Sequence, residues 1–162
     1  MIASAAPSFI PPLAAAHSQR LRIGVVTETY PPEINGVAMT IGRMVEGLLE
    51  RGYAVQLIRP RQHSGDRPCR KQNLDILPVP GFPIPFYREL RMGLPAGRLL
   101  AAHWRENPPD VVHLVTEGPL GYSALDAAGR LGLRVTSDFH TNFHRYSRHY
   151  GVGVLAQPII AY

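Results

Sequence analysis

The sequence predicts an α/β fold in which an open parallel sheet carries helices on both faces. Short runs of β-branched and aliphatic residues, typical of buried parallel strands, recur along the chain. Segments with apolar residues at helical spacing separate most of these runs. Proline, glycine and asparagine stand at the boundaries. This alternation of strand and helix is the pattern of a parallel sheet built from right-handed βαβ units.

Length and composition fit one globular domain. The chain has 162 residues, 45% of them hydrophobic and 18% charged, which excludes wholesale disorder. The single cysteine, Cys69, excludes an intramolecular disulfide and a zinc site built from cysteines. No apolar run approaches the roughly 20 residues that span a bilayer. Sixteen Arg and one Lys against twelve Asp and Glu give a net charge of +5. This charge favours anionic partners, unless the arginine content only reflects the composition of the genome.

Residues 1–20 contain Ala, Pro and Ser without periodicity, and we expect a flexible N-terminal extension. Pro7, Pro11 and Pro12 interrupt its apolar stretch, and no basic residue precedes that stretch. Both features argue against a signal peptide. A mis-assigned start codon would leave the same pattern.

The next segment predicts a βαβ unit. Leu21–Thr27 is a short β-branched run that ends in polar residues, as buried parallel strands do. The loop Glu28–Gly36 follows, with two prolines and an Asn-Gly turn signal. A helix then runs until Gly52 stops it, and a second strand covers Ala54–Arg59. The apolar stripe of this helix consists of Val37, Ile41, Met44, Val45, Leu48 and Leu49.

The middle of the chain predicts a strand and a helix separated by proline-rich sequence. Residues 60–73 form a polar, basic connection, and Leu74–Val79 is a third short strand. Pro78–Pro85 can be neither helix nor central strand, because proline lacks the N–H group that both need. A helix covers about Ala96–Glu106, and the Asn-Pro-Pro run at 107–109 ends it.

The last part predicts two further strands around one helix. Val111–Val115 is the fourth strand, and Arg134–Ser137 is the fifth. Gly118 and Pro119 open the helix between them, which continues to about Leu131. The residues of this helix that we expect to face inward are Leu120, Leu125 and Ala128.

Candidate functional residues follow the strands. In open α/β sheets, ligands bind beyond the carboxyl ends of the strands. We therefore expect Gly36, Glu117 and His140 to gather at one edge of the sheet. The loops that this rule selects are Glu28–Gly36, Thr116–Pro119 and Asp138–Asn142.

The first of these loops predicts an anion site at a helix N-terminus. It contains neither the G-x-G-x-x-G pattern of dinucleotide-binding loops nor the G-K-[ST] of a Walker A loop. Asn35 and Gly36 nevertheless stand directly before a helix, where free N–H groups and the helix dipole attract an anion. Glycine lets a phosphate approach closely. The alternative is an ordinary glycine-containing start of a helix.

Histidines, arginines and aromatic residues concentrate after the fifth strand. His140 and His144 could share a helical face and bind a metal, but no H-E-x-x-H pattern supports this. Basic residues next to aromatics could contact nucleic acid, but the cluster lies in an α/β pattern and not in a recognised nucleic-acid module. A solvated basic helix face is a third interpretation. His140 itself stands where the strand-end rule predicts chemistry.

Three segments resemble the N-terminal half of family 4 retaining glycosyltransferases, which have the GT-B fold. They are Arg22–Gly36, Asp110–Gly121 and Phe139–Gly151. Within the family they are most similar to GDP-mannose-dependent α-mannosyltransferases and sulfoquinovosyl-diacylglycerol synthases. The resemblance covers about 21–151, and it implies that 21–162 form a Rossmann-like, acceptor-side domain.

The resemblance also implies roles for individual residues. A glycine-containing loop approaches the donor's diphosphate, a role that falls on Asn35, Gly36 and Val37. A histidine lies beside the transferred sugar, which makes His140 the expected catalytic residue. The implied reaction retains the anomeric configuration, uses no metal and no cofactor, and lets the leaving phosphate help to deprotonate the acceptor. Expected cleft-lining residues are Glu117, Gly118, Thr141 and Asn142, and expected contacts to an acceptor or anion are His144, Arg145 and Arg148.

The implied partners are a nucleotide-sugar donor and a lipid or glycan acceptor. In the family, a second domain holds the donor through a paired-glutamate motif that this sequence lacks. We therefore expect a truncated N-terminal domain that transfers a hexosyl group, with mannosyl favoured, only as part of a longer enzyme. Phe82–Leu94 and the basic charge fit contact with an anionic membrane at the cytoplasmic face, although an ordinary proline-rich connection would look the same. No nucleic acid partner is expected. The alternative function is a non-catalytic α/β module that binds an anion or a partner.

Overall fold

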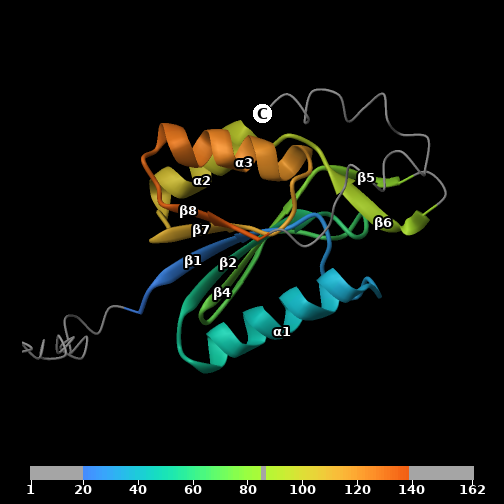
Figure 1. Ribbon diagram of the computed structural model, residues 1–162, viewed down its shortest axis with the longest axis horizontal. Coiled ribbons are helices and arrows are strands. Elements are labelled where there is room, and N and C mark those ends of the chain that lie inside the picture. Colours follow the sequence, from blue (N-terminus) through green and yellow to red (C-terminus); the bar gives the residue numbers. More distant parts are fainter. Residues whose placement is uncertain (1–19, 85–86, 139–162) are drawn as a thin grey trace, which may run out of the picture.

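The computed structural model describes residues 20–84 and 87–138, and these form a mostly parallel sheet between two layers of helix (Figure 1). The sheet has six strands in the order β3-β4-β2-β1-β7-β8. The expected N-terminal extension lies outside the described residues, apart from Arg20. The strands of the sheet are β1 (Arg22–Val26), β2 (Ala54–Pro60), β3 (Cys69–Lys71), β4 (Leu74–Val79), β7 (Val111–Leu114) and β8 (Val135–Ser137).

Strand β1 lies at the centre, between β2 and β7. Its residue Ile23 is in register with Val55 on one side and with Val111 on the other, and both pairings are parallel. Its residues Val25 and Val26 have no exposed surface. A β-branched strand with parallel neighbours on both sides is the arrangement that the sequence predicts.

The three helices cover both faces of the sheet. Figure 1 shows α1 (Gly36–Glu50) on one face, and α2 (Gly97–Glu106) and α3 (Pro119–Arg130) on the other. Successive strand residues point to opposite faces. Val25 accordingly packs in a core cluster with residues of α1, whereas Val26 packs in a second cluster with residues of α2 and α3. The predicted α/β architecture is confirmed.

The helix boundaries follow the predicted signals. The side chain of Asn35 caps α1 by accepting a 2.8 Å hydrogen bond from the backbone N–H of Ala38. Gly52 follows the last turn of α1 with a φ of +82°, a left-handed conformation that favours glycine. Gly118 and Pro119 open α3, with proline in the first turn where its missing N–H costs no hydrogen bond.

The basic connection at 60–73 contains a strand that the sequence analysis missed. Strand β3 pairs antiparallel with β4, so the sheet is not entirely parallel. Pro78 and Val79 belong to β4, which contradicts the expectation that proline keeps this segment out of an interior strand. The physical reason is that β3 pairs only with Leu74 to Ile76. At Pro78, β4 is therefore paired on the β2 side alone, and the missing N–H interrupts no ladder.

The rest of the proline-rich segment forms a small hairpin outside the main sheet. Strand β5 (Gly81–Ile84) pairs antiparallel with β6 (Tyr87–Gly93), and an irregularity lies between Pro83 and Ile84. Short two-stranded ribbons tolerate proline because each strand has one free edge. In Figure 1 the hairpin lies on the same side of the molecule as the N-terminal end of α1.

One predicted core residue of α3 is exposed. Leu120 and Ala128 have no exposed surface, as expected, but Leu125 is 46% exposed. The buried stripe of α3 instead runs through Leu120, Ala124 and Ala127. Leu125 lies five positions after Leu120, roughly 140° around a helix that turns 100° per residue, so its side chain points away from the sheet.

Candidate functional site

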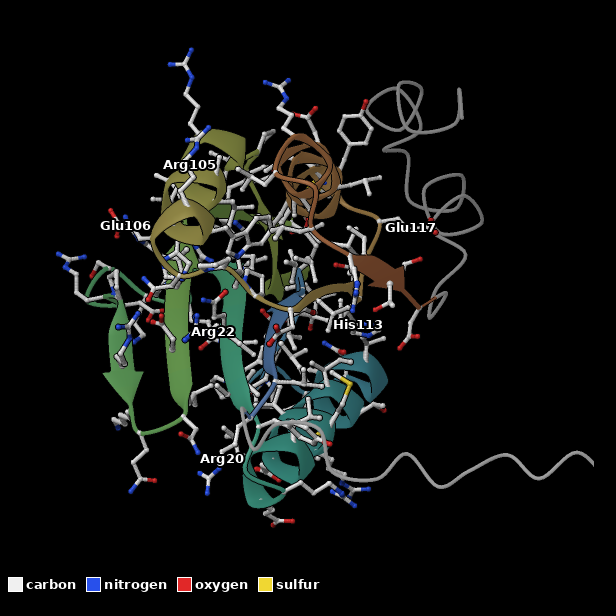
Figure 2. All side chains as sticks on the ribbon, turned by 90° about the vertical axis from the view of Figure 1, so that its left-hand side faces the viewer. Arg20, Arg22, Arg105, Glu106, His113 and Glu117 are labelled. Atoms are coloured by element: carbon white, nitrogen blue, oxygen red, sulfur yellow. The ribbon has the colours of Figure 1, made fainter. Side chains whose placement is uncertain are left out.

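The loops after β1 and β7 meet at the carboxyl edge of the sheet. The two strands are parallel neighbours, so both loops leave the sheet on the same side. The backbone N–H of Glu28 donates a 2.9 Å hydrogen bond to the hydroxyl of Thr116 and joins the loops directly. Gly36 begins α1 from the first loop, and Figure 2 labels the exposed Glu117 where the chain enters α3. The expected place of these two residues at one edge is thus observed.

Six of the predicted site residues follow the last described residue, Asp138. Of the loop after β8, only Asp138 is described. The predicted site residues that lie outside the described residues are His140, Thr141, Asn142, His144, Arg145 and Arg148.

The start of α1 is held by a short relay of side chains. The Asn35 amide donates a 2.7 Å hydrogen bond to the hydroxyl of Thr29, and that hydroxyl donates to the carboxyl group of Glu33. The other end of the Asn35 amide caps α1. The backbone N–H groups of Gly36 and Val37 precede the first intrahelical hydrogen bond and have no partner within the helix.

Gly36 is open to solvent. A Cβ atom added to Gly36 would meet no heavy atom within 4 Å, and the residue is exposed. Val37 is half-buried. An open helix N-terminus at the carboxyl edge can accept a phosphate by hydrogen bonds and by the helix dipole. The geometry therefore suits the anion site that the Asn35-Gly36 motif predicts.

Glu28 is a buried carboxyl group that the sequence analysis did not single out. Its side chain accepts a 3.0 Å hydrogen bond from the N–H of Leu120 in α3 and another from the N–H of Gly93 at the end of β6. Burial raises the pKa of Glu28 to about 7, although backbone hydrogen bonds from Gly93, Leu120 and Gly121 act in the opposite direction. An acidic residue two positions after a buried strand, at the edge where chemistry is expected, was the available signal.

Glycines surround the Glu28 carboxyl group. A Cβ atom on Gly118 would overlap the Glu28 carboxyl oxygen, and a Cβ atom on Gly93 would lie 2.8 Å from that carboxyl group. A Cβ atom on Gly121 would overlap the carbonyl oxygen of Thr116. Gly118, expected to line the cleft, is in fact buried against Glu28, and its neighbour Glu117 is the exposed residue of the pair.

The loop after β2 supports the loop after β1. Arg59 and Asp66 form a buried ion pair with a 2.6 Å contact. Asp66 also accepts from the backbone of Gln62, whose amide donates to the carbonyl of Tyr30 at 2.9 Å. Burial raises the pKa of the Glu33 carboxyl group, while the Thr29 hydroxyl and the guanidinium groups of Arg59 and Arg91 lower it. A buried guanidinium group, that of Arg59, and a buried carboxylate, that of Asp66, thus lie next to the loop after β1.

His113 connects β7 to the end of β8. Its ring nitrogens lie 3.0 Å from the Thr136 hydroxyl and 3.1 Å from the Asp138 carboxylate. His113 is on the α1 side of the sheet, because its neighbours Val112 and Leu114 pack on the other side (Figure 2). It therefore fixes the point at which the predicted His140 loop leaves the sheet.

Within the described ranges 20–84 and 87–138, His, Cys, Asp and Glu side chains form no group of three or more that could hold a metal ion. The same ranges contain no helix that is long and apolar enough to cross a bilayer.

An open helix N-terminus at the carboxyl edge of an α/β sheet is a place where phosphorylated ligands can bind. Residues 34–161 match the sequence pattern of Glycosyltransferase Family 4. The match covers most of the chain, which therefore belongs to glycosyltransferase family 4. The resemblance inferred from the three motifs is confirmed.

The curated relatives are sugar transferases of two kinds. A GDP-mannose-dependent alpha-mannosyltransferase of Mycolicibacterium smegmatis is 31% identical over 88% of this chain and 38% of the relative. A protein of the same name from Mycobacterium tuberculosis is 30% identical over the same shares. An alpha-monoglucosyldiacylglycerol synthase of Streptococcus pneumoniae is 25% identical over 85% of this chain and 31% of the relative. The chain thus spans between about a third and two fifths of the length of these relatives.

Proposed function

We propose that this domain forms the acceptor side of a retaining glycosyltransferase that moves a hexosyl group from a nucleotide sugar to a lipid or glycan acceptor. The observation that carries the proposal is the open N-terminus of α1 at Gly36, placed at the carboxyl edge and held by the Asn35 relay. A nucleotide sugar carries its leaving group as a diphosphate. Such an anion fits the backbone N–H groups of Gly36 and Val37.

The proposed chemistry consists of stabilising the leaving diphosphate and orienting the sugar. Preorganised N–H donors at a helix N-terminus gain strength as negative charge develops on the leaving oxygen. Because α1 is fixed by packing on the sheet, its dipole needs no reorganisation during the reaction. The leaving phosphate then takes the proton of the attacking hydroxyl group, as the family resemblance implies.

His140 is our candidate for the catalytic residue. The strand-end rule predicts His140 at the carboxyl edge, and the family resemblance implies a place beside the transferred sugar, where an imidazole can donate a hydrogen bond as charge separates. Glu117, Thr141 and Asn142 are candidates for contacts with the substrates in the cleft. His144, Arg145 and Arg148 are candidates for contacts with an anionic acceptor.

Mannose is the favoured sugar, and a lipid is the favoured acceptor. The two mannosyltransferases are 31% and 30% identical to this chain over 88% of it, and two glucosyldiacylglycerol synthases are 25% and 30% identical over 85% and 80% of it. The longer alignments with the mannosyltransferases support mannose. The name of the two synthases contains a diacylglycerol lipid. Because the chain spans 38% of its mannosyltransferase relative, we propose that a further domain holds the nucleotide and that the 162-residue chain alone transfers no sugar.

The test is a transfer assay with the complete enzyme that contains this chain. GDP-mannose and UDP-glucose are offered separately with diacylglycerol in mixed micelles, and products are identified by mass spectrometry. We expect a mannosylated lipid, with the anomeric configuration of the donor. A glucosylated lipid would correct the sugar and keep the reaction class. Binding of either donor without any product, with lipid or glycan acceptors, would favour a non-catalytic module and contradict the proposal.

A further inference from the structure

We propose that Glu28 is a positioning residue whose carboxyl group ties the end of β1 to both α3 and β6, and thereby fixes the Glu117–Gly118 loop. That this loop lines a substrate cleft rests on the proposed function. The connection between the three elements rests on the described contacts alone.

The contacts of Glu28 reach three segments far apart in sequence. One carboxyl oxygen accepts from Leu120 in the first turn of α3, and the other accepts from Gly93, the last residue of β6. The backbone N–H of Glu28 donates to Thr116, which precedes the Glu117–Gly118 loop. A single residue therefore contacts the loop on both sides and joins it to the hairpin.

The surroundings of Glu28 are shaped to its side chain. Gly93 and Gly118 leave no room for a Cβ atom beside the carboxyl oxygens. The side chain lies in a space that these glycines leave, and the residue is 6% exposed. Larger residues at these positions would displace the carboxyl group from the amides that it accepts.

The backbone N–H groups around the Glu28 side chain need a hydrogen-bond acceptor. The carboxyl group accepts these hydrogen bonds from the backbone N–H groups of Gly93 and Leu120, and a buried N–H group without an acceptor destabilises the folded arrangement. Glutamine keeps the size of the side chain but replaces one acceptor oxygen by an NH₂ donor. Alanine removes both acceptors.

The charged groups around Glu28 set how it titrates. Glu33 in the same loop raises the pKa of Glu28, together with burial. Its other neighbouring elements carry Arg91 on β6 and Glu117 before α3. We call the arrangement in which the Glu28 carboxyl group is buried on the amides of Gly93 and Leu120 the closed state. Since the pKa of about 7 lies above the ordinary value of 4.5, the closed state binds a proton that a solvated Glu28 would release. The closed state is therefore favoured most below pH 4.5 and loses this contribution as the pH rises through about 7.

The test is amide hydrogen exchange of the 162-residue chain, read residue by residue by NMR and corrected for the intrinsic exchange rates. In Glu28→Ala, the amides of Gly93 and Leu120 should exchange about tenfold to a hundredfold faster. In Glu28→Gln, one of these two amides should exchange faster, because one acceptor oxygen is replaced by a donor. The amide of Ala38, which is also capped by a side chain but lies in α1, should keep its protection. The matched control is Glu106→Gln, which changes an exposed glutamate at the C-terminal end of α2.

A pH series separates positioning from mere filling of space. In the wild type, the opening equilibrium of these two amides should increase on the order of a hundredfold between pH 4.5 and 7, because each pKa unit is a factor of ten. Glu28→Gln should abolish that dependence. Unchanged protection in Glu28→Gln together with no pH dependence in the wild type would overturn the proposal, even if Glu28→Ala failed to fold. Neither result depends on sugar transfer, so failure here is distinct from failure of the proposed function.

Discussion

Single side chains at the carboxyl edge connect segments that are distant in sequence. Glu28 bonds to Leu120, and Gln62 bonds to the carbonyl of Tyr30. These bonds lie between loops and not within the sheet, so they determine where the loops stand relative to each other. Gly118 contributes by having no Cβ atom, because a Cβ atom there would overlap the Glu28 carboxyl group.

Gly118→Ala tests that statement. We expect a loss of unfolding free energy of about 1–3 kcal/mol, because the new Cβ atom overlaps the carboxyl oxygen of Glu28. Gly118 has a φ of −77°, so the cost comes from the overlap and not from the backbone. Urea unfolding measures it. The control is Gly129→Ala, where nothing lies within 4 Å and alanine should stabilise the helix by up to about 1 kcal/mol. Equal stability of the two variants would show that the Glu28 carboxyl group is not held against Gly118.

His140→Ala tests the proposed catalytic residue. Loss of a preorganised hydrogen-bond donor costs on the order of 3–4 kcal/mol, or roughly a hundredfold to a thousandfold in rate. We therefore expect kcat of the complete enzyme to fall by that factor, with an unchanged melting temperature. His144→Ala is the comparison and should lose much less activity. A near-normal kcat for His140→Ala with a strongly reduced kcat for His144→Ala would contradict the assignment of His140 as the catalytic residue.

At the scale of elements, the sequence patterns predicted the strand bounds and helix ends that depend on neighbouring residues in the chain. The observed β4 has the predicted bounds, and α1 begins directly after Asn35 and ends two residues before Gly52. Strand β3 and the hairpin were missed because they depend on pairing partners and not on their own composition. Their three to seven residues contain prolines or charges that disfavour strands in isolation.

The candidate site also contains residues that the sequence predicted and residues that it did not. The strand-end rule placed Gly36 and Glu117 at one edge, because that position depends only on the strand directions. Glu28 was missed because its partners Gly93 and Leu120 are 65 and 92 positions away. Its function as an acceptor is visible only once β6 and α3 are folded against β1. The role of Gly118 as space for a carboxyl group was hidden for the same reason.

The β5–β6 hairpin is the element that we expect to contact anionic lipid. Phe82 on β5 is 40% exposed, and Leu94 directly after β6 is 43% exposed. Phe82→Ser should weaken binding of the chain to phosphatidylglycerol vesicles several-fold, because an aromatic side chain gains about 1–2 kcal/mol on entering the interface. Co-sedimentation measures the affinity. Leu99→Ser, which alters a residue of α2 with a similar exposure of 42%, is the control. An equal effect of both substitutions, or none, would contradict a specific role of the hairpin.

At the scale of the whole molecule, the described domain presents one functional edge. The loops after β1, β2 and β7 are joined there by hydrogen bonds, and the hairpin is fixed to them through Gly93. The buried ion pair of Arg59 and Asp66 holds the loop after β2 to its own strand. An edge that is rigid before the donor arrives lowers the cost of orienting it. The chain spans 38% of its mannosyltransferase relative, and we propose that a further domain of the complete enzyme closes over this edge.

The most direct test of this account is kcat/KM for the nucleotide sugar in the complete enzyme carrying Gly36→Leu, compared with Gly129→Leu. Both glycines are exposed, and neither has a heavy atom within 4 Å of an added Cβ atom, so both variants should fold. Only Gly36 lies at the proposed phosphate site. We predict that Gly36→Leu lowers kcat/KM for the nucleotide sugar by about a hundredfold, and that Gly129→Leu leaves it unchanged. Equal kcat/KM values for the two variants would contradict the claim that the N-terminus of α1 receives the donor phosphate.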